Sequence, residues 1–230
     1  MNNFDFANQF EKRVSSEYPN GIEWGIVGIL TKNGNVYTLS YDSKILSGIF
    51  EIFCEPIVSQ IAAENGLVVE KSSQNSYPDF TLFNPDLPSQ KIAVEVKSTY
   101  RQYTKDGIIK KFGYTLGSYR SFLRDPKGKK GILYPYHQYK KHWIIGFLYS
   151  RNSSCTDTEI RKIIEASNLQ SPYSDIQYFV QEKYKIAGEK PGSGNTTNIG
   201  SIKSNNIEDF QNGLGPFKSH EDFESYWRKY

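Results

Sequence analysis

Cysteine is scarce in this chain of 230 residues, and long apolar runs and internal repeats are absent. The two cysteines, Cys54 and Cys155, lack a CxxC motif or a histidine-rich neighbourhood, which argues against a zinc site and favours isolated reduced thiols. No apolar stretch approaches the roughly 18 residues that a membrane span needs. Residues 1–12 also lack the apolar core of a signal peptide. We therefore expect a cytoplasmic protein without membrane contact.

Sequence of low complexity is confined to a short cluster of Gly, Ser, Asn and Thr near residue 192. This argues against a solenoid or a long disordered tail. A chain of this length can bury a sizeable core without disulfide or metal staples. We expect residues 1–230 to form a single domain.

The apolar pattern predicts both strands and helices. Residues 24–30 and 36–39 flank the turn-forming pair Asn33-Gly34 and predict a β-hairpin. Residues 43–65 carry apolar side chains at helical spacing and predict a long helix, which Pro56 should kink or divide. Further patterns predict strands at 67–70, 79–83, 91–97, 143–149 and 176–180, and a polar helix near 158–167. The expected fold class is α/β or α+β, with a mixed β-sheet flanked by helices.

Positive charge is concentrated in the middle of the chain, although the formal net charge is only +3. Residues 101–151, here termed the basic belt, hold 12 basic and 2 acidic side chains. Residues 1–100 hold 7 basic and 12 acidic side chains, and residues 152–230 hold 9 and 11. A polyanion is a natural partner, since each Lys or Arg that neutralises a phosphate releases counterions. We predict that the belt, including Lys129 and Lys130, contacts DNA phosphates; a merely solvated basic surface is the alternative.

Three charged residues form the candidate catalytic group. Asp79 follows Pro78, which favours an extended backbone at the residue before it, so Asp79 is expected at the start of a strand. Glu95 and Lys97 lie on the alternating strand 91–97 and therefore share one face. If the two strands pair, the Asp79 and Glu95 carboxylates converge.

Such a group suits metal-dependent hydrolysis of a phosphodiester. Magnesium is commonly held by one or two carboxylates together with water and substrate phosphate oxygens. An ammonium group beside it can stabilise the developing charge or orient the attacking water. Alone, the PD…ExK pattern is weak, because carboxylates and lysines also combine on solvated strand edges. The strand context and the adjoining basic belt favour the catalytic interpretation.

A second polar cluster covers residues 191–201. Its glycines allow close approach of the backbone, and its Asn and Thr side chains can read base edges, Asn being well suited to adenine. An ordinary flexible surface loop is the alternative interpretation. The cluster is not a Walker A loop, because no Gly-Lys-Ser/Thr follows the first glycine at the required spacing.

Several longer segments make a family resemblance specific. The sequence resembles type II restriction endonucleases of the PD-(D/E)XK superfamily along nearly its whole length, and the matching segments are 47–51, 77–82, 115–117, 142–146 and 192–202. The resemblance implies a homodimer in which each subunit cuts one strand of a palindromic DNA duplex. It also implies magnesium as cofactor, with manganese able to replace it, and products with 5′-phosphate ends. The matched loop suggests the target GATATC, cut to blunt ends.

The same resemblance assigns site residues position by position. Asp79, Glu95 and Lys97 become the catalytic triad. Glu51, on the long helix, becomes an auxiliary catalytic carboxylate and joins Asp79 and Glu95 as a metal ligand. The residues expected to read the DNA bases are Gly192, Ser193, Gly194, Asn195 and Thr196 in a major-groove loop, and Gln74 and Asn75 in a minor-groove loop.

Three departures from the restriction enzyme that the chain resembles limit this transfer. Glu95 stands in place of an aspartate, which adds one methylene and alters the metal geometry but not the chemistry. Ser76 replaces a histidine in the minor-groove loop, so contacts there should differ. The chain ends at Tyr230, where the similar enzyme continues into a basic segment on the DNA backbone; this loss should weaken affinity more than sequence choice.

Two other functions stay open at this point. One is a DNA-binding protein on a nuclease fold without catalysis, against which the joint presence of Asp79, Glu95 and Lys97 argues. The other is a repair or recombination nuclease that cuts by DNA structure, which has little need of a base-reading loop such as 191–201. A nucleotide-binding metabolic enzyme is disfavoured, because no Gly-rich phosphate loop joins a strand to a helix.

Overall fold

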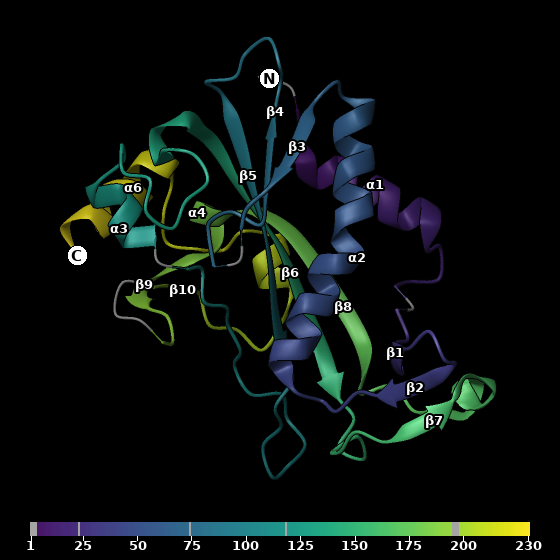
Figure 1. Ribbon diagram of the computed structural model, residues 1–230. Helices are drawn as coiled ribbons and strands as arrows, with labels where there is room; N and C mark the ends of the chain where they lie inside the picture. Colours follow the sequence, from purple (N-terminus) through teal and green to yellow (C-terminus); the bar gives the residue numbers. More distant parts are fainter. Residues whose placement is uncertain (1–3, 23, 74, 118, 195–197) are drawn as a thin grey trace.

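The computed structural model describes residues 4–22, 24–73, 75–117, 119–194 and 198–230. Its centre is a five-stranded mixed sheet (Figure 1). In spatial order the strands are β3 (Val68–Lys71), β4 (Phe80–Phe83), β5 (Lys91–Tyr100), β6 (Tyr139–Arg151) and β8 (Tyr173–Glu182). β5 and β6 run parallel, and the other neighbours run antiparallel. The strands predicted for this sheet are present, with boundaries shifted by a few residues.

Helices cover both faces of this sheet (Figure 1). On one face lie α1 (Phe6–Glu17) and α2 (Ser43–Glu64), whose apolar side chains form a core with Ile92 and Val94 of β5. The other face is covered by α3 (Tyr119–Arg124), the 3-10 helix η1 (Tyr136–Gln138), α4 (Lys183–Ile186), α5 (Glu208–Gln211), α6 (His220–Lys229) and the hairpin of β9 (Ala187–Pro191) and β10 (Ile199–Ser201). Because side chains alternate along β5, Ala93 and Glu95 point towards this second core.

α2 is continuous, although it contains a proline. The Asp42 carboxylate caps its start by accepting a hydrogen bond of 2.8 Å from the Lys44 N–H. The helix runs on to Glu64, so of the two predicted effects of Pro56 the division does not occur, and the kink stays a prediction. Pro56 lies on the exposed side, and Ile52, whose carbonyl loses its intrahelical donor, is 66% exposed. Water can therefore satisfy that carbonyl.

α2 also bears on the expected lack of membrane contact. Among the described residues it is the one helix long and apolar enough to cross a bilayer, judged by length and composition alone. Its inward side belongs to the core, where Phe50 stacks on Phe147 of β6 with ring centroids 4.6 Å apart. The core helix of a soluble protein has the same composition, so this helix is weak evidence for a membrane span.

A separate three-stranded sheet consists of β1 (Gly28–Leu30), β2 (Asn35–Thr38) and β7 (Ile160–Lys162). β1 and β2 pair antiparallel around Asn33-Gly34, which confirms the predicted hairpin, although β1 is shorter than the apolar run. The helix predicted near 158–167 is wrong in part, because β7 pairs with β2 and only the 3-10 helix η2 (Ile163–Asn168) is helical. The β2 backbone pairs with residues 160–162 as a neighbouring strand, and the local sequence alone does not reveal this pairing.

Candidate active site

Two paired strands bring the acidic residues together. β4 and β5 pair, which meets the condition set by the sequence analysis, and they run antiparallel with Phe80 opposite Val94. Asp79 immediately precedes β4, and its Oδ2 accepts a hydrogen bond of 2.6 Å from the Val96 N–H of β5. Glu95 lies between Val94 and Val96 on the inward face, where it is 5% exposed. The β5 backbone therefore helps to orient the Asp79 carboxylate next to Glu95.

Lys97 connects the two carboxylates. Its Nζ lies 2.8 Å from Glu95 Oε1 and 4.0 Å from Asp79 Oδ2. The Lys97 and Asp79 side chains are 22% and 23% exposed and border on solvent, whereas Glu95 lies deeper. The structure thus brings Asp79, Glu95 and Lys97 into one group that a phosphate can approach from solvent.

A fourth charged residue, Lys183, belongs to the same group and is missed by the sequence analysis. It is the first residue of α4, and its Nζ lies 2.6 Å from Glu95 Oε2. Its side chain is 1% exposed. Glu95 therefore lies between two ammonium groups, one at each carboxylate oxygen. The segment QEKYK at 181–185 resembles a solvated charged run, and only the packing of α4 against the sheet reveals this contact.

Burial and mutual charge perturb the ionisation of this group. Burial raises the pKa of Asp79, Lys97 opposes that shift, and Glu95 adds to it. Burial alone would raise the pKa of Glu95, but the charges and hydrogen bonds of Lys183 and Lys97 outweigh it and lower that pKa. Burial alone would lower the pKa of Lys97, but the negative charges of Glu95 and Asp79 outweigh it and raise that pKa. Burial lowers the pKa of Lys183 to about 8. Glu95 is accordingly ionised at neutral pH.

Glu51 approaches this group from α2. Burial raises its pKa, and the Asp79 charge raises it further. Cys54, further along the same helix, is fully buried. Burial has the largest effect on its thiol and raises the pKa, and the negative charges of Asp79 and Glu51 raise it further. The Asp79 charge thus acts on both side chains of this stretch of α2. Glu51 itself is partly exposed, as expected for a residue at the rim of the site.

The Asp79 and Glu95 carboxylates suit a hard divalent cation. Their oxygens already converge on a positive group, the Lys97 ammonium, and two carboxylates with phosphate oxygens and water form a common magnesium ligand set. Among the described residues, no three His, Cys, Asp or Glu side chains are grouped closely enough to hold a metal. Glu51 therefore does not complete a three-carboxylate site in this structure. A metal here would depend on ligands from substrate and solvent.

The predicted recognition loop joins β9 to β10. The Gly192 N–H donates a hydrogen bond of 3.0 Å to the Asn198 carbonyl and closes the base of the loop. The Ser193 hydroxyl lies 2.8 Å from the Thr115 hydroxyl, which ties the loop to a segment outside the hairpin. Ser193 and Gly194 are exposed, and Gly194 adopts a φ of +87°, which suits a residue without a side chain.

A short segment, residues 115–117, connects this hairpin to the acidic group. The Leu116 N–H donates to the Ile199 carbonyl at 2.7 Å, and the Ile199 N–H donates to the Gly117 carbonyl at 3.0 Å. Gly117 adjoins the active site, since a Cβ added to it would lie 3.7 Å from Glu95 Oε1. Backbone hydrogen bonds thus join the recognition hairpin to Gly117, which lies close to the Glu95 carboxylate.

The segments that carry the remaining predicted DNA-contacting residues lie next to each other, because the Tyr77 N–H donates a hydrogen bond of 2.9 Å to the Gly131 carbonyl. Asn75 is exposed and has a φ of 67°. Lys129 and Lys130 are exposed in the segment that follows α3. Three predicted residues lie outside the part of the chain that the structure describes: Gln74, Asn195 and Thr196.

Comparison with known proteins identifies the family. The family model described as "Restriction endonuclease EcoRV" matches residues 20–230. The chain is also 41% identical over 219 residues to the type II restriction enzyme EcoRV of Escherichia coli, an alignment that covers 94% of this chain and 86% of that enzyme. This chain belongs to the EcoRV restriction endonuclease family.

Membership in the EcoRV family confirms two predictions from the sequence. The first is the family itself, the type II restriction endonucleases. The second is the fold class, which the mixed sheet with helices on both faces also bears out.

Proposed function

We propose that this EcoRV family member is a cytoplasmic type II restriction endonuclease that hydrolyses phosphodiester bonds in double-stranded DNA with magnesium as its cofactor. The observation that carries the proposal is the convergence of Asp79 and Glu95 on the Lys97 ammonium at the solvent boundary. Two carboxylates and a lysine within reach of one phosphate suit metal-assisted phosphodiester hydrolysis.

Each residue of this group has a separate task in the proposed reaction. Asp79 and Glu95 would hold magnesium, or manganese in its place, together with phosphate oxygens and water. Such an ion would supply positive charge at the scissile phosphate and would lower the pKa of a water bound to it. Lys97 donates a hydrogen bond to the phosphoryl oxygen on which negative charge develops, or to the water that attacks. Glu51 adds negative charge at the rim, which favours a cation.

The proposed target is a short palindrome, and GATATC cut to blunt ends with 5′-phosphates is the specific case. The loop at 191–201 supports base reading, because its base is tied to Thr115 and to the β9–β10 hairpin while Ser193 and Gly194 stay exposed. Asn195 in this loop can form a bidentate pair with adenine. The exposed Lys129 and Lys130 would contact phosphates, which position the protein without reading sequence.

A palindrome is matched by a two-fold symmetric dimer, and we propose that the protein acts as a homodimer. The small sheet β1-β2-β7 supports this proposal. Ile29 is opposite Tyr37, and Tyr37 is opposite Ile160, across its three strands. Opposed side chains share one face, and these three are 60%, 40% and 59% exposed. They form an apolar patch typical of a protein contact.

Digestion of a sequenced plasmid with the purified protein, with magnesium or with a chelator, tests the proposed activity. We expect discrete fragments with magnesium, none with chelator, and fragment ends at one short palindrome. Asp79→Ala and Lys97→Ala should abolish cleavage but still bind duplex in a gel-shift assay, because both groups act mainly in the transition state. Glu51→Ala should be milder, since Glu51 lies at the rim. Wild-type rates in both Asp79→Ala and Lys97→Ala would refute the active-site assignment.

The two alternative functions give different outcomes in the same assays. A DNA-binding relative without catalysis would shift the duplex and leave the plasmid uncut under every metal condition. A repair or recombination nuclease would cut branched or flapped DNA and would not produce discrete plasmid fragments.

A further inference from the structure

The Lys183 side chain is buried inside the protein and ends at the inner oxygen of Glu95. We propose that Lys183 is a positioning residue of the active site, which holds Glu95 Oε2 so that Oε1 is directed at Lys97 and at the side of the site from which a phosphate approaches. The inference rests on the proposed function and deepens it, because it adds a residue that acts through Glu95 from the interior side of the site.

The register of the sheet explains how Lys183 reaches Glu95. Glu95 of β5 is opposite Ile144 of β6, and Ile144 is opposite Gln181 of β8. Backbones two strands apart are separated by about 10 Å, so two long side chains are needed to meet across the strand between them. Lys183 follows β8 at the start of α4 and meets Glu95 Oε2 at 2.6 Å. The connection joins α4 and β8 to the catalytic strand.

A purely structural purpose explains this lysine poorly. Burial of an ammonium group is costly unless the charge is paired, and replacement of a buried ion pair by apolar side chains is often neutral or stabilising. The Lys183 side chain is 1% exposed and pairs with a glutamate that is itself 5% exposed, so both charges of the pair are kept from water. The Lys183 charge lies 2.6 Å from Glu95, a proposed metal ligand. Its effect on Glu95 explains the burial of this charge better than a purely structural purpose does.

The two lysines at Glu95 differ in their access to solvent, which separates their tasks. Lys97 is 22% exposed and lies within 4.0 Å of Asp79, so it can exchange a carboxylate oxygen for a phosphate oxygen. Lys183 is enclosed and has no such access. Glutamate also has one more rotatable bond than aspartate, so its carboxylate requires more restraint. Lys183 supplies that restraint at Oε2 and leaves Oε1 to the reaction.

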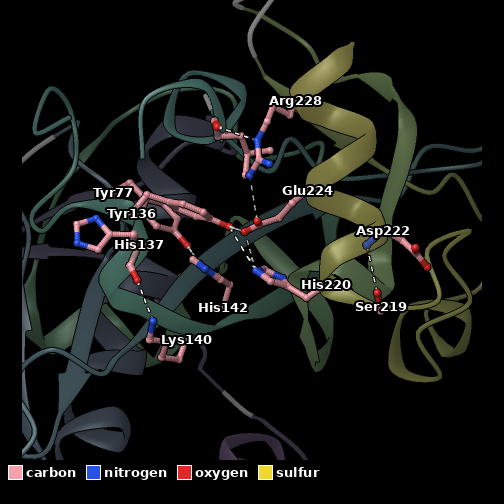
Figure 2. Close-up of polar contacts among 11 residues, drawn as sticks. Tyr77, Tyr136, His137, Lys140, His142, Ser219, His220, Asp222, Glu224 and Arg228 are labelled. Carbon is pink, nitrogen blue, oxygen red and sulfur yellow. Dashed lines mark hydrogen bonds and ion pairs between the residues drawn. The ribbon is translucent and has the colours of Figure 1, made fainter. Parts of the chain in front are cut away.

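Tyr77 restricts the position of the Lys183 ammonium from the other side. Its ring centroid lies 4.5 Å from Lys183 Nζ, a cation–π contact, and its hydroxyl lies 2.5 Å from His142 Nδ1. Figure 2 shows that His142 in turn faces His220 and Glu224 of α6. The two imidazole rings stack with centroids 5.3 Å apart, and His220 Nε2 lies 3.0 Å from Glu224. Tyr77 is therefore held by His142 of β6, which α6 contacts in turn, and it limits where Lys183 can move.

Single-turnover cleavage of a duplex spanning the mapped site tests the inference. Lys183→Met keeps the length of the side chain and removes its charge, and it should lower the rate at least about tenfold. Lys183→Arg keeps the charge and should retain more of the rate than Lys183→Met. Lys185→Met is the matched control, because Lys185 lies on the same helix, is 39% exposed and pairs with Glu182 at 3.1 Å. Its rate should stay within about twofold of wild type.

A metal-binding measurement distinguishes positioning from a general loss of structure. Electron paramagnetic resonance counts free Mn²⁺ in the presence of protein and duplex, and the Lys97→Ala background prevents turnover. Addition of Lys183→Met to this background should leave Mn²⁺ binding as tight as before or tighten it, because Glu95 loses a competing positive charge. Cleavage in the Lys183→Met protein would thus fall without a loss of metal affinity. If Lys183→Met does not fold, as judged by circular dichroism, Lys183→Gln takes its place in both measurements.

Two outcomes would overturn the inference. A Lys183→Met cleavage rate within about twofold of wild type would mean that Glu95 needs no such restraint. Weaker Mn²⁺ binding, accompanied by a lower unfolding midpoint than that of Lys185→Met, would mean that Lys183 only stabilises the fold. In both cases the proposed function stands if Asp79→Ala is inactive. Cleavage by Asp79→Ala at the wild-type rate would instead refute the active site itself.

Discussion

Glu95 carries its negative charge in a part of the protein with little access to water. Lys97 and Lys183 neutralise it, at 2.8 and 2.6 Å, and hold its pKa down against the effect of burial. Asp79 lies nearer to solvent and has a raised pKa, mainly through burial. The placement of the Glu95 carboxylate therefore depends on two partners at once. A change in the length of the Glu95 side chain tests this dependence.

We predict that Glu95→Asp reduces cleavage without abolishing it. The change withdraws the carboxylate by one methylene from both Lys97 and Lys183, in a backbone adapted to glutamate. Manganese should recover part of the rate, because magnesium demands near-ideal octahedral geometry and manganese is more tolerant. Single-turnover rates with each metal measure the effect. A magnesium rate equal to that of the wild type would show that the extra methylene has no consequence.

At the scale of elements, the hairpin of β9 and β10 is joined to the active site by residues 115–117. A DNA contact made at the tip of the loop can therefore affect Glu95 through a few backbone hydrogen bonds, with Gly117 as the last contact. Recognition and cleavage are built on adjoining segments, so a loss of base contacts should appear in the cleavage rate.

We predict that Asn195→Ala weakens cleavage at the mapped site by about 1–3 kcal/mol, the worth of one good bidentate pair. Non-specific binding should hardly change, since phosphate contacts supply it. Cleavage rates on the mapped duplex and anisotropy on a random duplex measure the two quantities. Equal losses on both duplexes would contradict base reading by this loop.

A second contact between elements attaches α6 to the sheet through buried polar groups (Figure 2). His142 of β6 is 3% exposed and contacts the Tyr77 hydroxyl and the His220 ring. Burial lowers the pKa of His142 well below its ordinary value of 6.5, and the positive charges of His220 and Lys183 lower it further. The neutral form is therefore the one that the folded protein accommodates.

We predict that acid destabilises the protein through His142. Its pKa is lower in the folded than in the unfolded chain, so the stability it contributes is present above pH 6.5 and is lost as the pH falls towards the folded pKa. The free energy of unfolding should fall by up to about 1.4 kcal/mol per pH unit in this window. Urea unfolding between about pH 8 and about pH 5 measures the slope. His142→Gln should flatten it, and His137→Gln, at an exposed position, should not; equal slopes in all three proteins would exclude His142 as the cause.

At the scale of the whole molecule, the positive charge of the basic belt should make the affinity for DNA depend measurably on salt concentration. Each phosphate contact contributes a slope of about −0.9 in log affinity against log salt concentration. The double substitution Lys129→Ala and Lys130→Ala should flatten the slope by up to about 1.8. Anisotropy titrations over a salt series measure it. An unchanged slope would mean that these two exposed lysines are solvated and do not contact phosphates.

The apolar patch on β1-β2-β7 makes a second prediction at this scale. Ile29→Asp combined with Ile160→Asp should convert the protein to a monomer, because two charges would be buried in the proposed contact. Leu87→Asp is the control, since Leu87 is exposed by 42% in the turn between β4 and β5, outside the patch. Sedimentation velocity measures the mass of each protein. A dimer that survives the double substitution would place the contact elsewhere.

The sequence by itself determined the features that depend on neighbouring residues. Alternation along 91–97 predicted that Glu95 and Lys97 share a face, and the Pro78-Asp79 step predicted an acidic residue at the start of a strand. The Asn33-Gly34 turn predicted the β1–β2 hairpin. These are local features, because side-chain alternation and turn geometry are set by the backbone within a few residues.

Only the tertiary structure decided the features that join distant parts of the chain. Residues 160–162 form the strand β7 because they pair with β2. α2 continues through Pro56 because that side of the helix is exposed to water. Lys183 appears in the sequence as one more charged residue and becomes part of the site because β6 and β8 bring it across the sheet to Glu95. In each case the deciding partner is far away along the chain, and the energy of burial and pairing with that partner outweighs the local preference.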